Sequence, residues 1–214
     1  MNRRHLIAGL AACALPLYPS GPALAAGSAS RSFRILRDGS EIGSHSLAAR
    51  AGPDGFEIEI EIDIVVRVLG IAAYRYRLRN RERWAGGRLV ELDAATNDDG
   101  TENFARIRRE ADALAVEGSG HTGRVPLDAA TTSYFVPEFL DRRIWISTQS
   151  GTPLAVKVAP AGPGRWAVSG ELDTTLFYDG RGEWMGSEFD AGGETASYEL
   201  VAQSGRIVPL WRGS

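Results

Sequence analysis

The chain has 214 residues, which is enough for one domain with a core of its own. It carries 24 basic and 27 acidic residues, a formal charge of −3 at pH 7, and this excludes an electrostatic nucleic-acid binder because no excess positive charge is available for phosphates. Cys13 is the only cysteine and lies in the leader described next, so the rest of the chain can form neither an internal disulfide nor a catalytic thiol.

Residues 1–26 are typical of a secretory signal peptide. Arg3 and Arg4 form a short basic region, residues 6–17 are apolar but too short to cross a membrane, and 23–25 form an A-x-A cleavage site. We therefore expect a periplasmic protein cleaved near Ala25-Ala26, with residues 27–214 as a single β domain without a transmembrane helix. Two alternatives stay open: a lipoprotein anchored at Cys13, and twin-arginine export in place of the general secretory route.

The mature chain opens with two predicted strands, 32–37 and 41–50, which are joined by an Asp-Gly turn and followed by turn residues at 52–55. From Phe56 to Val68 apolar side chains then alternate with an acidic row that begins at Glu57 and ends at Asp63. Side chains in a strand alternate between two faces, so this is the strongest strand signal in the chain.

A second alternation follows the turn at Leu69-Gly70, with arginines at every odd position from Arg75 to Arg83. If the two strands form a hairpin around this turn, facing residue numbers have an even sum and the arginine row lies beside the acidic row. Such pairs contribute little when exposed, but a slip of one residue would bury charges, so they fix the register.

A third strand, 88–97, continues this central sheet. We take 85–87 as a three-residue loop that pairs Trp84 with Arg88, which would place Glu91 opposite Arg81 and Asp93 opposite Arg79. The arginine row would then have acidic neighbours on both sides.

The remaining predicted strands are short and separated by turn residues. They cover about 102–109, 113–117, 153–159, 164–172, 174–179, 183–189 and 195–202, with 206–211 as a candidate last strand. Residues 118–130 are expected to form a loop, and a short helix is expected near 137–142 because Pro137 suits a first helical turn. The fold class is therefore all-β: a single curved antiparallel meander sheet, either a half-barrel or a barrel, with one short helix.

Several segments together resemble a family of exported proteobacterial domains of unknown function. They are Phe33-x-Ile35-x3-Gly39-x2-Ile42-Gly43, Glu82-x-Trp84-x2-Gly87-Arg88-Leu89, residues 97–100, 131–134 and 148–151, and Phe177-Tyr178-Asp179 with Gly182. The chain is more distantly similar to periplasmic carriers of the lipoprotein-carrier type that have a curved sheet. The resemblance implies export and a curved β-sheet, and it implies no chemistry.

The sequence predicts no catalytic residue, no metal ligand set and no cofactor. His45 and His121 lack metal-ligand spacing and are interpreted as surface histidines. Residues 118–121 contain Ser119 beside His121 but no nucleophile elbow, and no glycine-rich phosphate loop precedes a helix.

The inner face of the sheet is the remaining candidate site, where polar and aromatic side chains interrupt the apolar rows. The candidate cavity-lining residues are Tyr74, Tyr76, Asn80, Glu82, Trp84, Tyr134, Phe135 and Phe177. Glu82 is either a polar group in an apolar cavity or a strand-end carboxylate bonded to the next turn or to an arginine.

Three functions follow from this interpretation. The first is a non-enzymatic binder of a lipid or another apolar or amphipathic ligand in the concave face of the sheet. The second is an envelope structural or assembly factor with a packed core that acts through contacts with an envelope protein. The third is an enzyme with an unusual site around Glu82 or His121.

Overall fold

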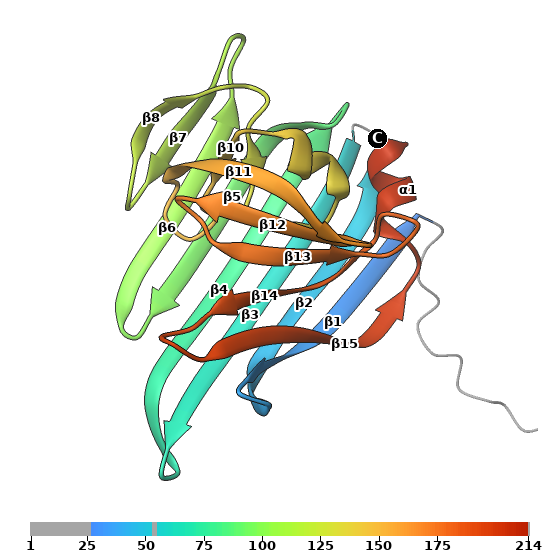
Figure 1. Cartoon of the computed structure of the whole chain (residues 1–214). Coiled ribbons are helices and arrows are strands. Elements are labelled where there is room, and N and C mark those ends of the chain that lie inside the picture. The colour runs from blue at the N-terminus through green and yellow to red at the C-terminus, as the bar shows by residue number, and fades with distance from the viewer. Residues whose placement is uncertain (1–26, 53–54, 214) are drawn as a thin grey trace, which may run out of the picture.

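A computed structural model of the chain describes residues 27–52 and 55–213, so the predicted signal peptide and the Pro53-Asp54 part of a predicted turn lie outside the described residues. The described residues form one 15-stranded sheet with two short helices (Figure 1). The elements are β1 (Ser28–Arg37), β2 (Ser40–Gly52), β3 (Gly55–Val68), β4 (Ile71–Ala85), β5 (Arg88–Asp98), β6 (Thr101–Arg109), β7 (Leu114–Gly118), β8 (Thr122–Val125), β9 (Ala130–Thr131), η1 (Pro137–Asp141), β10 (Ile144–Ile146), β11 (Pro153–Gly162), β12 (Arg165–Gly170), β13 (Thr174–Tyr178), β14 (Trp184–Asp190), β15 (Thr195–Ser204) and α1 (Ile207–Arg212).

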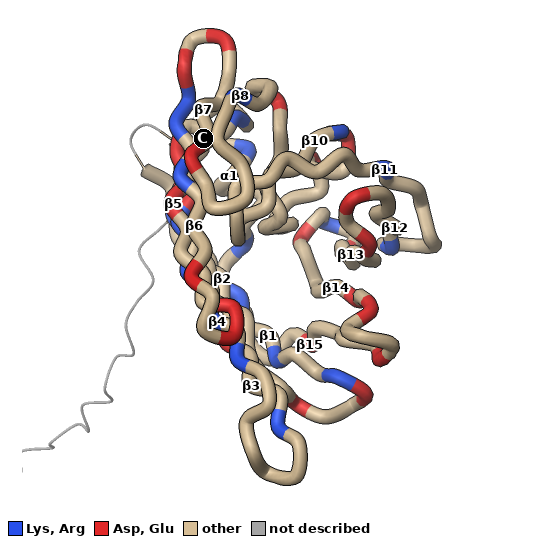
Figure 2. The backbone as a smooth tube through the Cα atoms, turned by 90° about the vertical axis from the view of Figure 1, so that its left-hand side faces the viewer, with Lys and Arg blue, Asp and Glu red and all other residues tan. Residues whose placement is uncertain are grey.

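The sheet is a curved meander that is not closed. Its strand order runs from β8 down to β1, then from β15 down to β9, so β1 and β15 join the two halves and β8 and β9 are the edges. All pairs are antiparallel except β9 with β10. Figure 2 shows the two halves as walls that face each other across the interior. The predicted all-β class with a curved antiparallel sheet is confirmed, and the sheet is an open half-barrel.

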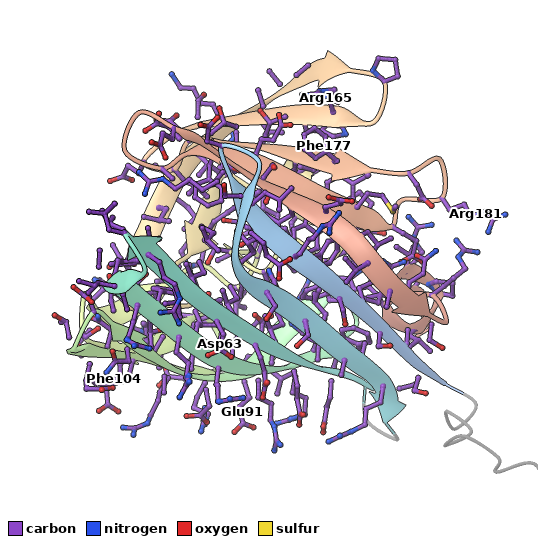
Figure 3. The ribbon with its side chains drawn as sticks, turned by 90° about the horizontal axis from the view of Figure 1, so that it is seen from below. Asp63, Glu91, Phe104, Arg165, Phe177 and Arg181 are labelled. Carbon is purple, nitrogen blue, oxygen red and sulfur yellow. The ribbon has the colours of Figure 1, made fainter. Side chains whose placement is uncertain are left out.

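The central hairpin has the predicted register. Glu59 lies opposite Arg81 and Asp63 opposite Arg77, and these pairs form ion pairs of 2.6 Å each. A third ion pair, Glu61 with Arg79, lies between these two along the strands. Figure 3 shows Asp63 and Glu91 among the charged side chains on the outer face of these strands. The inner face of the same strands carries mostly apolar and aromatic side chains, together with the buried polar residues Asn80 and Glu82.

The predicted register of β4 and β5 is wrong by two residues. Glu91 lies opposite Arg83 and Asp93 opposite Arg81. One residue of this shift comes from a loop of two residues rather than three, and the other comes from a bulge in β5, where Val90 is the extra residue between Leu89 and Glu91. The loop contains two residues, Gly86 and Gly87, whose φ angles of 54° and 69° suit the tight turn that matches strand twist. Acidic residues still lie on both sides of the arginine row.

Two other predicted segments differ from the structure. The expected loop 118–130 contains β8, which pairs with β7. The candidate strand 206–211 is instead the helix α1. The helix forms because the carboxylate of Glu183 accepts the backbone N–H groups of Ile207 (3.1 Å) and Val208 (3.2 Å), a cap supplied from a distant part of the chain. The predicted short helix is confirmed as the 3-10 helix η1.

The core is densely aromatic at the end of the sheet remote from the Leu69-Gly70 turn. A cluster with ring centroids 5.0–5.9 Å apart fills this end. Its members are Phe56, Trp84, Phe135, Phe139 and Trp211. The opposite end of the concave face has no comparable filling, and the candidate site lies there.

Candidate functional site

An apolar cavity of about 560 Å³ lies on the concave face, toward the β3–β4 turn. Its floor is the inner row of β3, and the C-terminal half of the sheet supplies the facing wall. The residues of these two walls include Ile62, Ile64, Val66 and Val68 of β3, Tyr74 and Tyr76 of β4, Phe189 of β14, and Ala196 and Tyr198 of β15. Val68 is 58% exposed, so the cavity reaches the surface at this residue.

A second cavity of about 270 Å³ continues deeper into the interior. It shares Ile62, Tyr76, Gln149, Phe189 and Tyr198 with the first cavity. Its lining adds polar groups from the segment 147–149 and from Thr132 and Ser187. The two cavities are therefore adjacent, and the lining is more apolar near the β3–β4 turn and more polar inside.

Tyr74 and Tyr76 are fixed at this space by a small polar network. The Tyr74 hydroxyl donates to Asp98 Oδ1 at 2.8 Å, and Gln149 Nε2 donates to Asp98 Oδ2 at 3.1 Å. The Tyr76 hydroxyl lies 3.4 Å from Gln149 Oε1. Burial raises the pKa of Tyr76 to about 12 and raises the pKa of Tyr74 as well, so both phenols are neutral donors.

Of the eight predicted cavity residues, the structure brings Tyr74, Tyr76 and Tyr134 to the cavity wall. Trp84 and Phe135 belong to the aromatic cluster instead. Phe177 lies on the other face of its strand, where the guanidinium of Arg165 stacks over its ring at 4.5 Å (Figure 3). The prediction that Phe177 lines the cavity is therefore wrong, and its neighbours Leu176 and Tyr178 point inward instead.

Asn80 and Glu82, which were also predicted to line the cavity, line neither of the two cavities, and Glu82 is fully buried. Its carboxylate accepts hydrogen bonds from Asn80 Nδ2 (2.7 Å), Trp84 Nε1 (2.8 Å) and Thr131 Oγ1 (3.1 Å), and from the hydroxyl of Ser133. Burial raises its pKa, while these four donors lower it. Glu82 is thus bonded neither to the next turn nor to an arginine, and it ties β4 to the segment 131–133.

His45 is the site residue that the sequence interpretation misplaced. It is 3% exposed, lines the deeper cavity and lies in an aromatic group with ring centroids 5.2 Å from Trp184 and 5.3 Å from Tyr198. Burial lowers its pKa to about 3, so the ring is neutral. The inward position follows from strand parity, because His45 shares a face with the buried Leu47 and Ala49.

Gln149, Phe189 and Tyr198 are cavity residues that the sequence did not single out, because they lie far from the central strands along the chain. Ile62, Ile64, Val66 and Val68 could have been found from their shared parity on β3. Across the described residues no group of three or more His, Cys, Asp or Glu is placed to hold a metal ion. The helices of residues 27–52 and 55–213 are too short or too polar to span a bilayer.

An open, curved, barrel-like sheet with an internal cavity defines the class of this protein. The chain belongs to the DUF6134 family, a domain of unknown function, whose profile matches residues 33–201. No match was found among curated proteins.

Two solved structures are similar to the fold. One is the beta-barrel-like protein of domain of unknown function DUF1849 from Brucella abortus, with a TM-score of 0.55, 10% identity, and coverage of 83% of this chain and 97% of that chain. The other is a DUF1089 family protein from Pseudomonas aeruginosa, with a TM-score of 0.41, 13% identity, and coverage of 66% and 87%. At such identities the first likeness shows the β-barrel-like fold alone.

Proposed function

We propose that the protein is a non-enzymatic binder that holds an apolar or amphipathic ligand, such as a lipid, in the concave face of its sheet. The single observation that supports this is the cavity of about 560 Å³ lined by the inner row of β3. Small-molecule sites are typically cavities of about 300–1,000 Å³ with mostly apolar walls and a few polar groups. The Tyr74–Asp98–Gln149–Tyr76 network supplies such polar groups at the wall.

The distribution of polarity favours an elongated ligand with a polar end. Ile64, Val66 and Val68 would contact its apolar part near the β3–β4 turn. Thr148 and Gln149 would face its polar end in the deeper cavity. Because Tyr74 and Tyr76 are neutral, these two phenols would recognise such a group by hydrogen bonds rather than by charge.

Native mass spectrometry of the purified protein, before and after organic extraction, tests the proposal. A bound mass that disappears on extraction supports a carrier and gives the class of ligand. A clean protein mass, together with no binding of a fluorescent fatty-acid probe, contradicts it. That result favours the alternative, an envelope assembly factor that acts through protein contacts.

A matched pair of variants links the binding to the cavity. Val66→Trp places a large ring in the cavity and should weaken binding of the fluorescent probe at least tenfold. Val201→Trp adds the same ring at an exposed position of β15 outside the cavity lining and should leave binding unchanged. Equal binding by both variants would place the ligand elsewhere.

The proposal includes export to the periplasm with removal of the leader near Ala25-Ala26. The supporting observation is the basic, apolar and A-x-A order of residues 1–26. N-terminal sequencing of the protein from the periplasmic fraction tests it. A mature chain that starts with an acylated Cys13 would show a lipoprotein instead.

A further inference from the structure

We propose that the tip of the β3–β4 hairpin docks on an anionic lipid bilayer. The tip consists of Val68, Leu69, Gly70 and Ile71, and we call it the hairpin tip. Val68 is 58% exposed, Leu69 98% and Ile71 74%, and together with Val201 they are the exposed large apolar residues of the described chain. Figure 1 shows this hairpin projecting beyond the rest of the sheet, and Figure 2 shows its end without acidic residues.

Leu69 breaks a rule that three other two-residue turns of the described residues follow. Asp38-Gly39, Gly86-Gly87 and Asp99-Gly100 are also two-residue turns with positive φ at both positions. Such turns favour Asn, Asp or Gly at the first position, and a leucine at φ of 52° is strained there. Leu69 therefore supports neither the turn nor the core, and its exposed side chain needs another explanation.

The charge next to the tip suits an anionic surface. Arg77, Arg79, Arg81 and Arg83 each form an ion pair across strands. The two arginines nearest the tip, Arg67 and Arg75, have no ion pair within the described residues. Arg75 lies opposite Val65 and Arg67 opposite Ala72, so neither faces an acid across the hairpin, and the Arg67 guanidinium donates to the carbonyl oxygen of Gly70 at 3.5 Å. Asp99 is close to Arg75, but it accepts the backbone N–H of that residue at 3.2 Å.

The size of the tip favours a bilayer over a protein partner. A stable protein interface needs about 800 Å² on each side, which three side chains on one narrow turn do not supply. Shallow insertion into a membrane interface needs only a few apolar side chains with nearby positive charge. The formal charge of the whole chain is −3, so attraction to an anionic surface must come from local arginines such as Arg67 and Arg75.

Docking at the hairpin tip would also orient the cavity. Val66 and Val68 line the cavity; Val68 belongs to the tip, and Val66 lies directly beside it on β3. A bilayer in contact with Leu69 and Ile71 would therefore lie at the end where the cavity reaches the surface. The docking itself does not depend on a ligand, so the Val66→Trp variant should keep its affinity for vesicles.

Co-sedimentation with vesicles of phosphatidylethanolamine and phosphatidylglycerol tests the proposal, with phosphatidylcholine vesicles for comparison. The wild-type protein should bind the anionic vesicles, and its affinity should fall as salt is raised. Leu69→Asn combined with Ile71→Thr should weaken binding at least tenfold. This variant should fold as well as the wild type, because Asn suits the turn and Thr suits a strand. Val201→Thr is the matched control and should bind like the wild type.

The charge is tested separately. Arg67→Gln combined with Arg75→Gln should weaken binding to the anionic vesicles, whereas Arg79→Gln combined with Arg81→Gln should have a smaller effect because those arginines are already paired. Absence of vesicle binding by the wild type overturns the proposal, and so does equal binding by the tip variant. Capture of a protein partner through the tip without vesicle binding overturns it as well.

Discussion

The carboxylate of Glu183 lies 2.8 Å from the guanidinium of Arg31, and both side chains are almost fully buried. The same carboxylate caps the first turn of α1 through the N–H groups of Ile207 and Val208. One acidic side chain therefore neutralises a buried arginine of β1 and positions the C-terminal helix, whose Trp211 belongs to the aromatic cluster.

We expect Glu183→Ala to lower the free energy of unfolding by about 3–5 kcal/mol, because it leaves the Arg31 charge buried without a counter-ion. Urea denaturation followed by tryptophan fluorescence measures this loss. Arg206→Ala is the control: its side chain is partly exposed and lies 3.3 Å from Glu183, so the cost should stay below about 1 kcal/mol. Equal costs for the two variants would show that the buried pair has no special role.

The exposed charge ladder should contribute far less per pair. Arg81 pairs with Glu59 at 2.6 Å, but both side chains are solvent-exposed. We expect Arg81→Gln to change the free energy of unfolding by less than about 1 kcal/mol, and by less still in high salt. A loss of several kcal/mol in the same urea experiment would contradict a role limited to register.

Glu82→Gln tests the buried carboxylate. The pKa of Glu82 is raised in the folded state, so the folded protein binds a proton more readily than the unfolded chain does. The stability that this proton contributes is present below the unfolded pKa of about 4.5 and is lost as pH rises through the folded pKa. As pH rises above about 4.5, the wild type should therefore lose stability relative to Glu82→Gln. A difference that is constant with pH would contradict the raised pKa.

Much of the fold could be predicted because its signals are local. The alternation from Phe56 to Val68 and the arginine row from Arg75 to Arg83 determine both strands, their faces and the register of their pairing. The register of β5 could not be predicted, since the bulge at Val90 has no clear signal in the sequence. The helix α1 was missed because its cap, Glu183, comes from a distant turn.

The residues at the wall of the candidate cavity could be predicted only in part, because strand parity is a local signal and the opposite wall is not. Tyr74 and Tyr76 share the inner face of β4 and reach the cavity, whereas Glu82 and Trp84 share that face but lie at the filled end. Strand parity gives the face of a residue, but only the packing of the opposite wall decides whether the space in front of it is empty. That wall comes from β14 and β15, which pair with the N-terminal half only through β1.

His45 should make the protein sensitive to acid. Its pKa falls to about 3 on folding because burial disfavours the charged ring, so the folded state binds a proton less readily than the unfolded chain does. The stability that the buried neutral ring contributes to the protein is fully present above the unfolded pKa of about 6.5. It is lost as pH falls toward 3, at up to about 1.4 kcal/mol per pH unit. His45→Phe keeps an aromatic ring among Phe33, Trp184 and Tyr198. Urea denaturation between pH 7 and pH 4 should therefore show a smaller loss of stability for this variant than for the wild type, because the carboxylates titrate equally in both. Parallel pH profiles would show that His45 is charged or solvated in the folded state.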